Sequence, residues 1–110
     1  MVLSLPDSFR EVLTEIKIKE KEMKKKFAVI GAILERPRET QHIFNDNVAE
    51  YKGIIKGRMG IPYDEAGVSV VSIIVFGTMD EINGLTGKLG NIKGISVKTS
   101  ISKKDFDNEA

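Results

Sequence analysis

The sequence of 110 residues contains no cysteine, no tryptophan and a single histidine, His42. Without cysteine the chain has no disulfide, no thiolate metal ligand and no cysteine nucleophile. A single histidine excludes a multi-histidine metal site, and no recognisable partners complete a Ser-His-Asp triad around it. We therefore expect no metal, no cofactor and no enzymatic activity.

An excess of charge of one sign is also missing. Seventeen Lys and Arg residues against 16 Asp and Glu give a net charge of +1. Such a chain has no overall field that recruits nucleic acid or an anionic membrane. Direct DNA binding is therefore not expected without a partner.

Long hydrophobic runs are absent as well. No stretch approaches the roughly 20 apolar residues of a membrane-spanning helix. The lysines at 24–26 followed by the apolar residues 27–34 are similar to a short secretory signal, but the run ends at Glu35 without a small-residue cleavage site. Eight apolar residues rich in β-branched side chains also suit a buried strand. We expect a cytoplasmic protein without a membrane partner.

The hydrophobic residues that are present, 41% of the chain, change their period at Phe27. Before this point the apolar residues follow helical spacing; they are Phe9, Val12, Leu13 and Ile16. The change divides the chain into an N-terminal helical extension (1–26), one domain (27–104) and an acidic tail (105–110) that we expect to be loose.

Within the domain, strand and helix patterns alternate. A helix is expected from Pro37, with Ile43 and Phe44 on its apolar face and Gly53 just after its end. A second helix opens at Thr78, where Thr78 and Glu81 have the spacing of a capping box. The pattern predicts four strands, at 27–34, 54–63, 68–76 and 95–102.

The resulting order, β-α-β-β-α-β, is that of the ferredoxin-like α+β fold with a four-stranded antiparallel sheet. The right-handed crossover rule puts the strands at 27–34 and 68–76 in the centre. These two strands carry almost no polar side chains, whereas the other two contain glycine or lysine and suit the edges.

Both central strands carry apolar residues on both faces. Alternation along a strand places Val29 and Ile30, for example, on opposite faces of the sheet. Two helices cover only one face, so the other would expose an apolar patch in a monomer. We therefore expect a homo-oligomer, a dimer or tetramer formed through the sheet, or partial cover by the N-terminal helix.

The glycine-rich segment 84–90 is the first candidate for a ligand site, because it is similar to a phosphate-binding loop. In the glycine-rich segment 84–90, however, Ile82 stands where a Walker A loop needs its first glycine, and Leu89 where it needs a hydroxyl. A better candidate for a small effector is the loop between the first strand and the first helix, where backbone amides and the helix dipole favour an anion. Its residues are Glu35, Arg36, Arg38, Glu39 and Thr40, although two solvated surface arginines would produce the same pattern.

Three segments carry a resemblance to a known family. They read KKKFAVIGAILERPRE from 24 to 39, MGIP from 59 to 62 and GLTGKLGNIKGISVKT from 84 to 99. Over residues 26–102 the chain resembles the iron-only hydrogenase system regulators, small proteins with an ACT-like ferredoxin fold. The residues of this sequence that match the family motif are Gly60, Pro62, Gly84, Gly87, Lys88, Gly90 and Gly94.

The resemblance implies a regulator linked to transcription. The same fold forms the ligand-binding half of nickel-responsive repressors, but their histidine and cysteine ligands are missing here. We expect a non-enzymatic regulatory or ligand-sensing domain. The alternative is a structural oligomerisation or protein-interaction module without a small-molecule effector.

Overall fold

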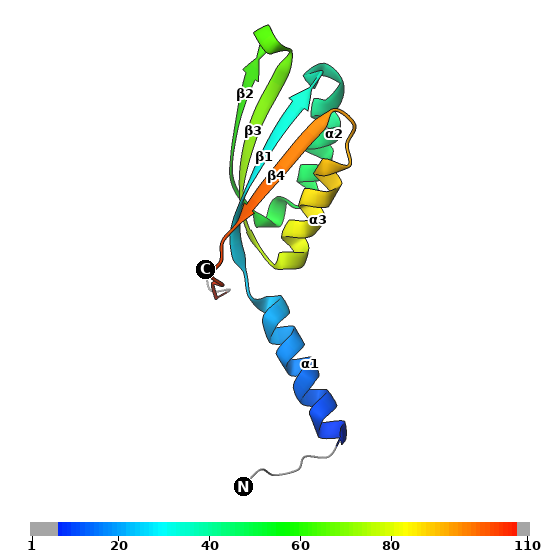
Figure 1. Cartoon of the computed structure of the whole chain (residues 1–110), viewed down its shortest axis with the longest axis vertical. Helices are drawn as coiled ribbons and strands as arrows, with labels where there is room; N and C mark the ends of the chain where they lie inside the picture. Colours follow the sequence, from blue (N-terminus) through cyan, green and yellow to red (C-terminus); the bar gives the residue numbers. More distant parts are fainter. Residues whose placement is uncertain (1–6, 108–110) are drawn as a thin grey trace.

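The computed structural model describes residues 7–107, apart from the side chains of residues 18–23 (Figure 1). Its helices are α1 (Asp7–Met23), α2 (Pro37–Ala49) and α3 (Met79–Gly90), with short 3-10 turns η1 (Lys52–Ile54) and η2 (Asp64–Ala66). Its strands are β1 (Lys26–Glu35), β2 (Ile55–Tyr63), β3 (Val68–Gly77) and β4 (Ile95–Ile101).

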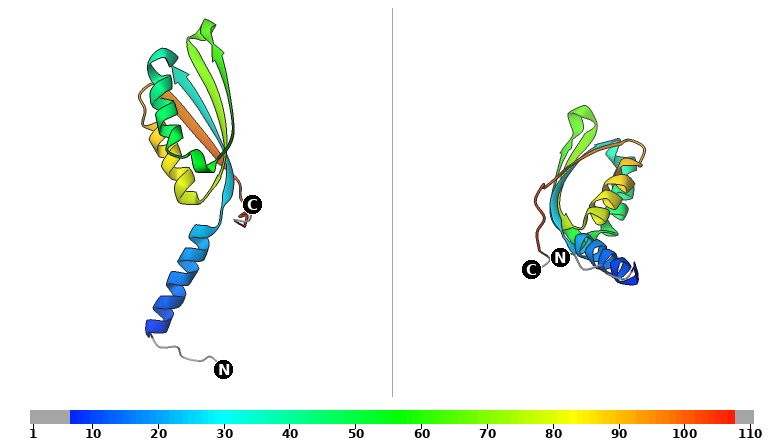
Figure 2. Two further views of the ribbon diagram at one scale, coloured as in Figure 1. Left: turned by 180° about the vertical axis from the view of Figure 1, so that it is seen from behind. Right: turned by 60° about the horizontal axis from the view of Figure 1, so that its bottom comes forward.

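The four strands form one antiparallel sheet in the order β2-β3-β1-β4. Helices α2 and α3 lie on the same face of this sheet (Figure 2). The ferredoxin-like α+β fold predicted from the sequence is therefore confirmed, with β1 and β3 in the centre as expected.

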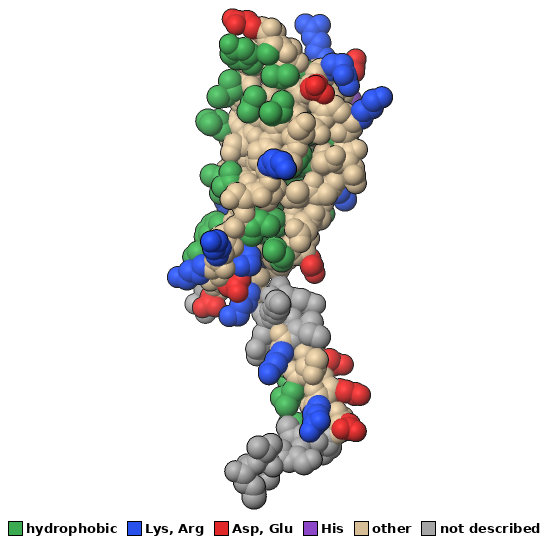
Figure 3. Space-filling model, viewed as in Figure 1, with side chains coloured by type: hydrophobic (Ala, Val, Ile, Leu, Met, Phe, Trp, Pro, Cys, Tyr) green, Lys and Arg blue, Asp and Glu red, His purple; other side chains and the backbone are tan. Residues whose placement is uncertain are grey.

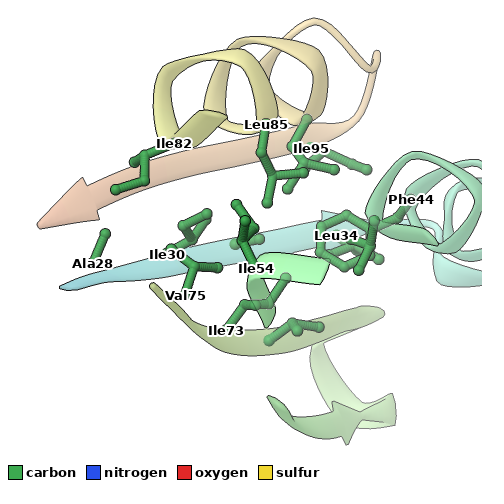
Figure 4. Packing of buried hydrophobic residues seen from close by; sticks show 14 residues of the cluster. Ala28, Ile30, Leu34, Phe44, Ile54, Ile73, Val75, Ile82, Leu85 and Ile95 are labelled. Carbon is green, nitrogen blue, oxygen red and sulfur yellow. The ribbon is translucent and has the colours of Figure 1, made fainter. Parts of the chain in front are cut away.

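The hydrophobic core lies between the sheet and these two helices (Figure 4). Every second residue of β1 from Ala28 to Leu34 is buried, and so is every second residue of β3 from Val71 to Val75. The helices supply the opposite wall of the core with Phe44, Val48, Ile82, Leu85 and Leu89. Alternation along the strands thus decides which half of their apolar side chains is enclosed.

Local signals set the helix ends. The predicted capping box at the start of α3 is present: Thr78 Oγ1 accepts from the Glu81 amide at 3.2 Å, and Glu81 Oε1 accepts from the Thr78 amide at 2.9 Å.

The prediction that Gly53 follows the end of α2 was wrong. The helix ends at Ala49, and the chain then turns through η1, which places Ile54 in the core. Ile43 is exposed, because Thr40 occupies the sheet-facing side of α2 together with Phe44.

The face of the sheet opposite the helices, here called the open face, is largely apolar. The register pairs Val29 with Ile74 and Ile33 with Val70 across β1 and β3 on this face. The corresponding positions of β4 are polar. The large apolar residues of the open face are 44–63% exposed; they are Phe27, Val29, Ile33, Met59, Ile61, Tyr63, Val70 and Ile74.

The tail predicted to be loose from residue 105 is in part held against the domain. Lys25 and Phe106 pair through two backbone hydrogen bonds of 2.8 and 3.2 Å. The Phe106 ring lies edge-on to Phe27, 5.1 Å between centroids, and Phe27 in turn packs on Phe76 at 4.5 Å. These aromatic contacts explain why the first residues of the tail pack against the domain. Residues 108–110 lie outside the described part of the chain.

Helix α1 extends from the end of the sheet at which β1 begins (Figure 1). Its apolar residues Phe9, Val12, Leu13 and Ile16 are each 38–51% exposed. Among the described residues, none of the helices combines the length and the hydropathy that a bilayer crossing would need. The boundary between α1 and a separately folding domain stays a prediction.

The two faces of β1 predict opposite outcomes for neighbouring substitutions. Ile30→Asp places a carboxylate at a position with no exposure and should cost several kcal/mol, a large part of the 5–15 kcal/mol that stabilises a typical domain. Val29→Asp lies on the open face, 47% exposed, and should leave the domain folded. Circular dichroism and urea unfolding of the two variants test this assignment, and equal loss of structure in both would contradict it.

Candidate functional site

A cleft of about 800 Å³ lies between the start of α2 and the β2–β3 hairpin. Three of the five residues predicted for an effector loop line it, namely Arg36, Arg38 and Glu39. The remaining lining residues are Pro37, Gln41, Pro62, Asp64, Gly67 and Ser69.

The other two predicted residues, Glu35 and Thr40, lie outside this lining and hold the loop in place. The Glu35 amide donates to the Gly94 carbonyl at 2.7 Å. The buried Thr40 hydroxyl donates to the Glu35 carbonyl at 2.9 Å and lies 3.2 Å from the Arg36 carbonyl. These bonds fix the end of β1 against the first turn of α2.

Arg36 precedes α2 in the left-handed conformation, with φ 48°. For a residue other than glycine this conformation is strained, so surrounding contacts must maintain it. Gly94 lies close by: a Cβ built there would be 3.1 Å from Arg36 Nη2 and 3.2 Å from Thr40 Cγ2, and its own φ is +89°. Position 94 therefore requires glycine for two reasons, the positive φ of its backbone and the close approach of Arg36 and Thr40.

The two walls of the cleft carry opposite charges. Arg36 Nε is 3.2 Å from Glu39 Oε2, so these two side chains largely neutralise each other. Among the described residues, neither Arg38 on the α2 wall nor Asp64 on the hairpin wall forms an ion pair. The first turn of α2 adds amide donors and the positive end of the helix dipole near Arg38.

A smaller hollow of about 230 Å³ adjoins the cleft and shares Gln41, Pro62 and Ser69 with it. Gly60 lines this hollow, as does Arg58, which donates to Asn45 Oδ1 at 2.6 Å and lies over the Phe44 ring.

The sequence did not predict that Gln41, Asp64 and Ser69 line the cleft. Only the pairing of β2 with β3 and the position of α2 bring them together, and no local motif signals it.

The glycine-rich segment 84–90 lies inside α3 and forms no loop, which agrees with the conclusion from the sequence that it is not a phosphate-binding loop. A Cβ at Gly84 would be 2.7 Å from the Tyr51 hydroxyl oxygen, so this glycine lets α3 approach the residues that follow α2. Lys88 forms an ion pair with Glu50, and its ammonium lies 5.6 Å from the centre of the Tyr51 ring. The hydrogen bond from Lys88 to Glu50 and the Glu50 charge raise the pKa of Lys88 above its ordinary value of 10.5. This part of the family motif therefore joins α3 to the end of α2.

Metal ligation has no candidate in the described part of the chain. No three side chains of His, Cys, Asp or Glu gather there in a way that could hold an ion. His42 lies exposed on the surface of α2.

Two glycines of α3 should respond differently to alanine. Gly84→Ala brings a methyl group against the hydroxyl of the half-buried Tyr51, so the ring must shift and the domain should be about 1 kcal/mol less stable than with alanine at Gly87. Gly87→Ala meets no atom within 4 Å and should stabilise it by about 0.5–1 kcal/mol through helix propensity. Urea unfolding of both variants measures the difference, and equal effects of the two substitutions would contradict the close contact at Gly84.

The raised pKa of Lys88 predicts a small pH-dependent contribution to stability. Folding favours the charged ammonium, so the contribution is present below pH 10.5 and is lost as the pH rises through the higher pKa of the folded state. The Lys88→Met variant lacks it at every pH. The stability difference between wild type and variant should therefore shrink above pH 10.5, which urea titrations on both sides of that pH can check. A difference that grows with pH would exclude the ion pair as its source.

Comparisons with known proteins place this geometry in a family. Residues 26–99 match the TM1266-like family model, described as "Iron-only hydrogenase system regulator, putative". The solved structure of protein TM1266 from Thermotoga maritima is similar, with a TM-score of 0.69 and 28% sequence identity; the match covers 72% of this chain and 99% of that one. No curated protein matches the chain.

The family match spans the whole sheet as far as Thr99, both covering helices and the loop at Arg36, and it begins at Lys26, after α1. The resemblance proposed from the three sequence segments is thereby confirmed. The chain belongs to the TM1266-like family of iron-only hydrogenase system regulators.

Proposed function

We propose that this chain is a non-enzymatic, ligand-sensing regulatory domain whose effector binds in the cleft at the start of α2. The observation that carries the proposal is the pair of oppositely charged walls, with Arg38 on one side and Asp64 on the other. A small molecule with both an anionic and a cationic group, such as a free amino acid, matches this arrangement.

The α2 wall suits the anionic end. Arg38 presents a planar guanidinium that can hold a carboxylate by two hydrogen bonds, and the helix N-terminus adds amide donors beside it. Asp64 begins η2 on the hairpin wall and suits an ammonium group. Glu39 weakens the site for a multiply charged anion, because its carboxylate already occupies Arg36.

The position of the cleft suits signal transmission. Its walls belong to α2 and to the tip of the β2–β3 hairpin, which lie on separate segments of the chain. A ligand that bridges the walls would favour the arrangement in which they are close, and so would stabilise one conformation of the edge strand β2. The family's description as a regulator supports a role linked to transcription.

Homo-oligomerisation is the second part of the proposal. The open face carries eight large apolar residues that no helix covers, which is the kind of patch that a partner usually buries. Direct DNA contact by the domain forms no part of the proposal, since the chain has a net charge of only +1. The same open face favours the alternative function, a structural oligomerisation module that binds no effector.

Thermal unfolding in the presence of small molecules separates these two functions. A ligand at 100 times its dissociation constant adds about 2.7 kcal/mol to stability, which raises the melting temperature measurably. We expect amino acids to do so more than inorganic phosphate or a simple amine, since each of these satisfies one wall only.

The Arg38→Gln variant should weaken the binding of such a ligand about 10–100-fold, because a hydrogen bond to a charged group contributes about 1.5–3 kcal/mol. Arg10→Gln on α1 is the matched control and should leave affinity unchanged. If none of the three compound classes shifts the wild-type melting temperature, the sensing function fails and the structural alternative stands.

A further inference from the structure

Two apolar surfaces of the chain have no partner within it. One is the open face of the sheet. The other, here called the α1 stripe, consists of Phe9, Val12, Leu13 and Ile16 along one side of α1. Figure 3 shows acidic side chains of α1 along one edge of the helix and hydrophobic ones toward the opposite edge.

In the structure α1 points away from its own sheet. Lys25 is paired with Phe106, which extends the line of β1 by one residue beyond the strand. Only Lys24 then separates this pair from the end of α1 at Met23. From this point α1 runs outward from the end of the sheet and does not lie along the open face of its own chain (Figures 1 and 2).

The open face is shaped to accept a large side chain. Gly31, in the middle of β1, has no side chain and leaves a hollow of about 350 Å³ bordered by Ile33, Val70 and Lys98. A Cβ built on Gly31 meets only the Lys98 carbonyl, at 3.8 Å, so packing within the chain does not demand glycine here. Phe9 is the largest residue of the α1 stripe and is half exposed.

Charge also matches across the two surfaces. On the open face, β4 contributes Lys98 next to the hollow. On α1, the stripe is bordered by charges of both signs, because helical spacing places Glu15 beside Val12 and Lys17 beside Leu13. Lys98 therefore favours the orientation in which the Glu15 side of the stripe faces β4 and the Lys17 side faces β3, whose open-face residues are uncharged.

We propose that α1 of one copy lies across the open face of a second copy, with Phe9 in the hollow at Gly31, and that the exchange is reciprocal. The inference rests on the proposed homo-oligomer and names its contact. The α1 stripe from Phe9 to Ile16 is about 10 Å long and the open-face residues from Val29 to Ile33 span about 13 Å, so the stripe covers the apolar middle of β1. Two such contacts per dimer need to bury only about 800 Å² each to reach a standard interface of about 1,600 Å².

Crosslinking between single-cysteine variants of the full chain tests the contact, because the wild type has no cysteine. Val12→Cys marks the α1 stripe and Ile33→Cys marks the open face. Mixing the two variants after co-unfolding, refolding them and adding a short flexible bismaleimide should yield a dimer that contains one copy of each, identified by mass spectrometry. Thr14→Cys, on the side of α1 away from the stripe, is the matched control and should crosslink to Ile33→Cys far less.

Any other pattern of crosslinks overturns the inference, and each pattern indicates a different arrangement. A crosslinked dimer of two Val12→Cys copies would show that two α1 helices pair, and a dimer of two Ile33→Cys copies would show two sheets face to face. Both of these results leave the proposed oligomer intact. An intrachain crosslink in the Val12→Cys/Ile33→Cys double variant would show α1 on its own sheet. A wild type that is monomeric at micromolar concentration by light scattering would remove the oligomer as well.

A filled hollow gives an independent check. Gly31→Leu should weaken dimerisation at least tenfold in sedimentation while leaving the circular dichroism spectrum unchanged, since its Cβ has room in the sheet. Unchanged dimerisation would exclude the hollow as the seat of Phe9.

Discussion

The pairing of β1 with a strand on each side is the constraint on which the rest of the structure depends. β1 bonds to β3 over its ten residues and to β4 over seven of them, so its register is held from both edges. Because side chains alternate with a period of two, a slip by one residue would exchange Ile30 for Val29 under the helices. The core, the open face and the hollow at Gly31 all follow from this one register.

The candidate site depends on the same strand at its far end. β1 stops at Glu35, whose amide bonds to Gly94 and whose carbonyl accepts from Thr40. These bonds orient the first turn of α2 and carry Arg36 into a conformation that costs roughly 1–2 kcal/mol for a residue with a Cβ. The strain is therefore maintained by two neighbouring segments, and it positions Arg38 on the wall of the cleft.

Predictions from the sequence held where the signal was local. The capping box at Thr78 needs only residues three apart, and the apolar runs of β1 and β3 identify central strands without knowledge of their partners. The end of α2 was misplaced because burial of Ile54, a tertiary contact, overrode the glycine signal at Gly53. Asp64 was missed as part of the cleft for the same reason, since it approaches α2 only after β2 and β3 pair.

The sequence by itself determined the order of the elements, the family and the presence of apolar side chains on both faces of the central strands. Only the tertiary structure decided which face the helices cover, since alternation is symmetric and both sets of side chains are apolar. The helices lie over the face with Ala28 and Ala32, while Gly31 is on the other. It also decided the pairing of Lys25 with Phe106, which joins residues 81 positions apart and which no local pattern in the sequence encodes.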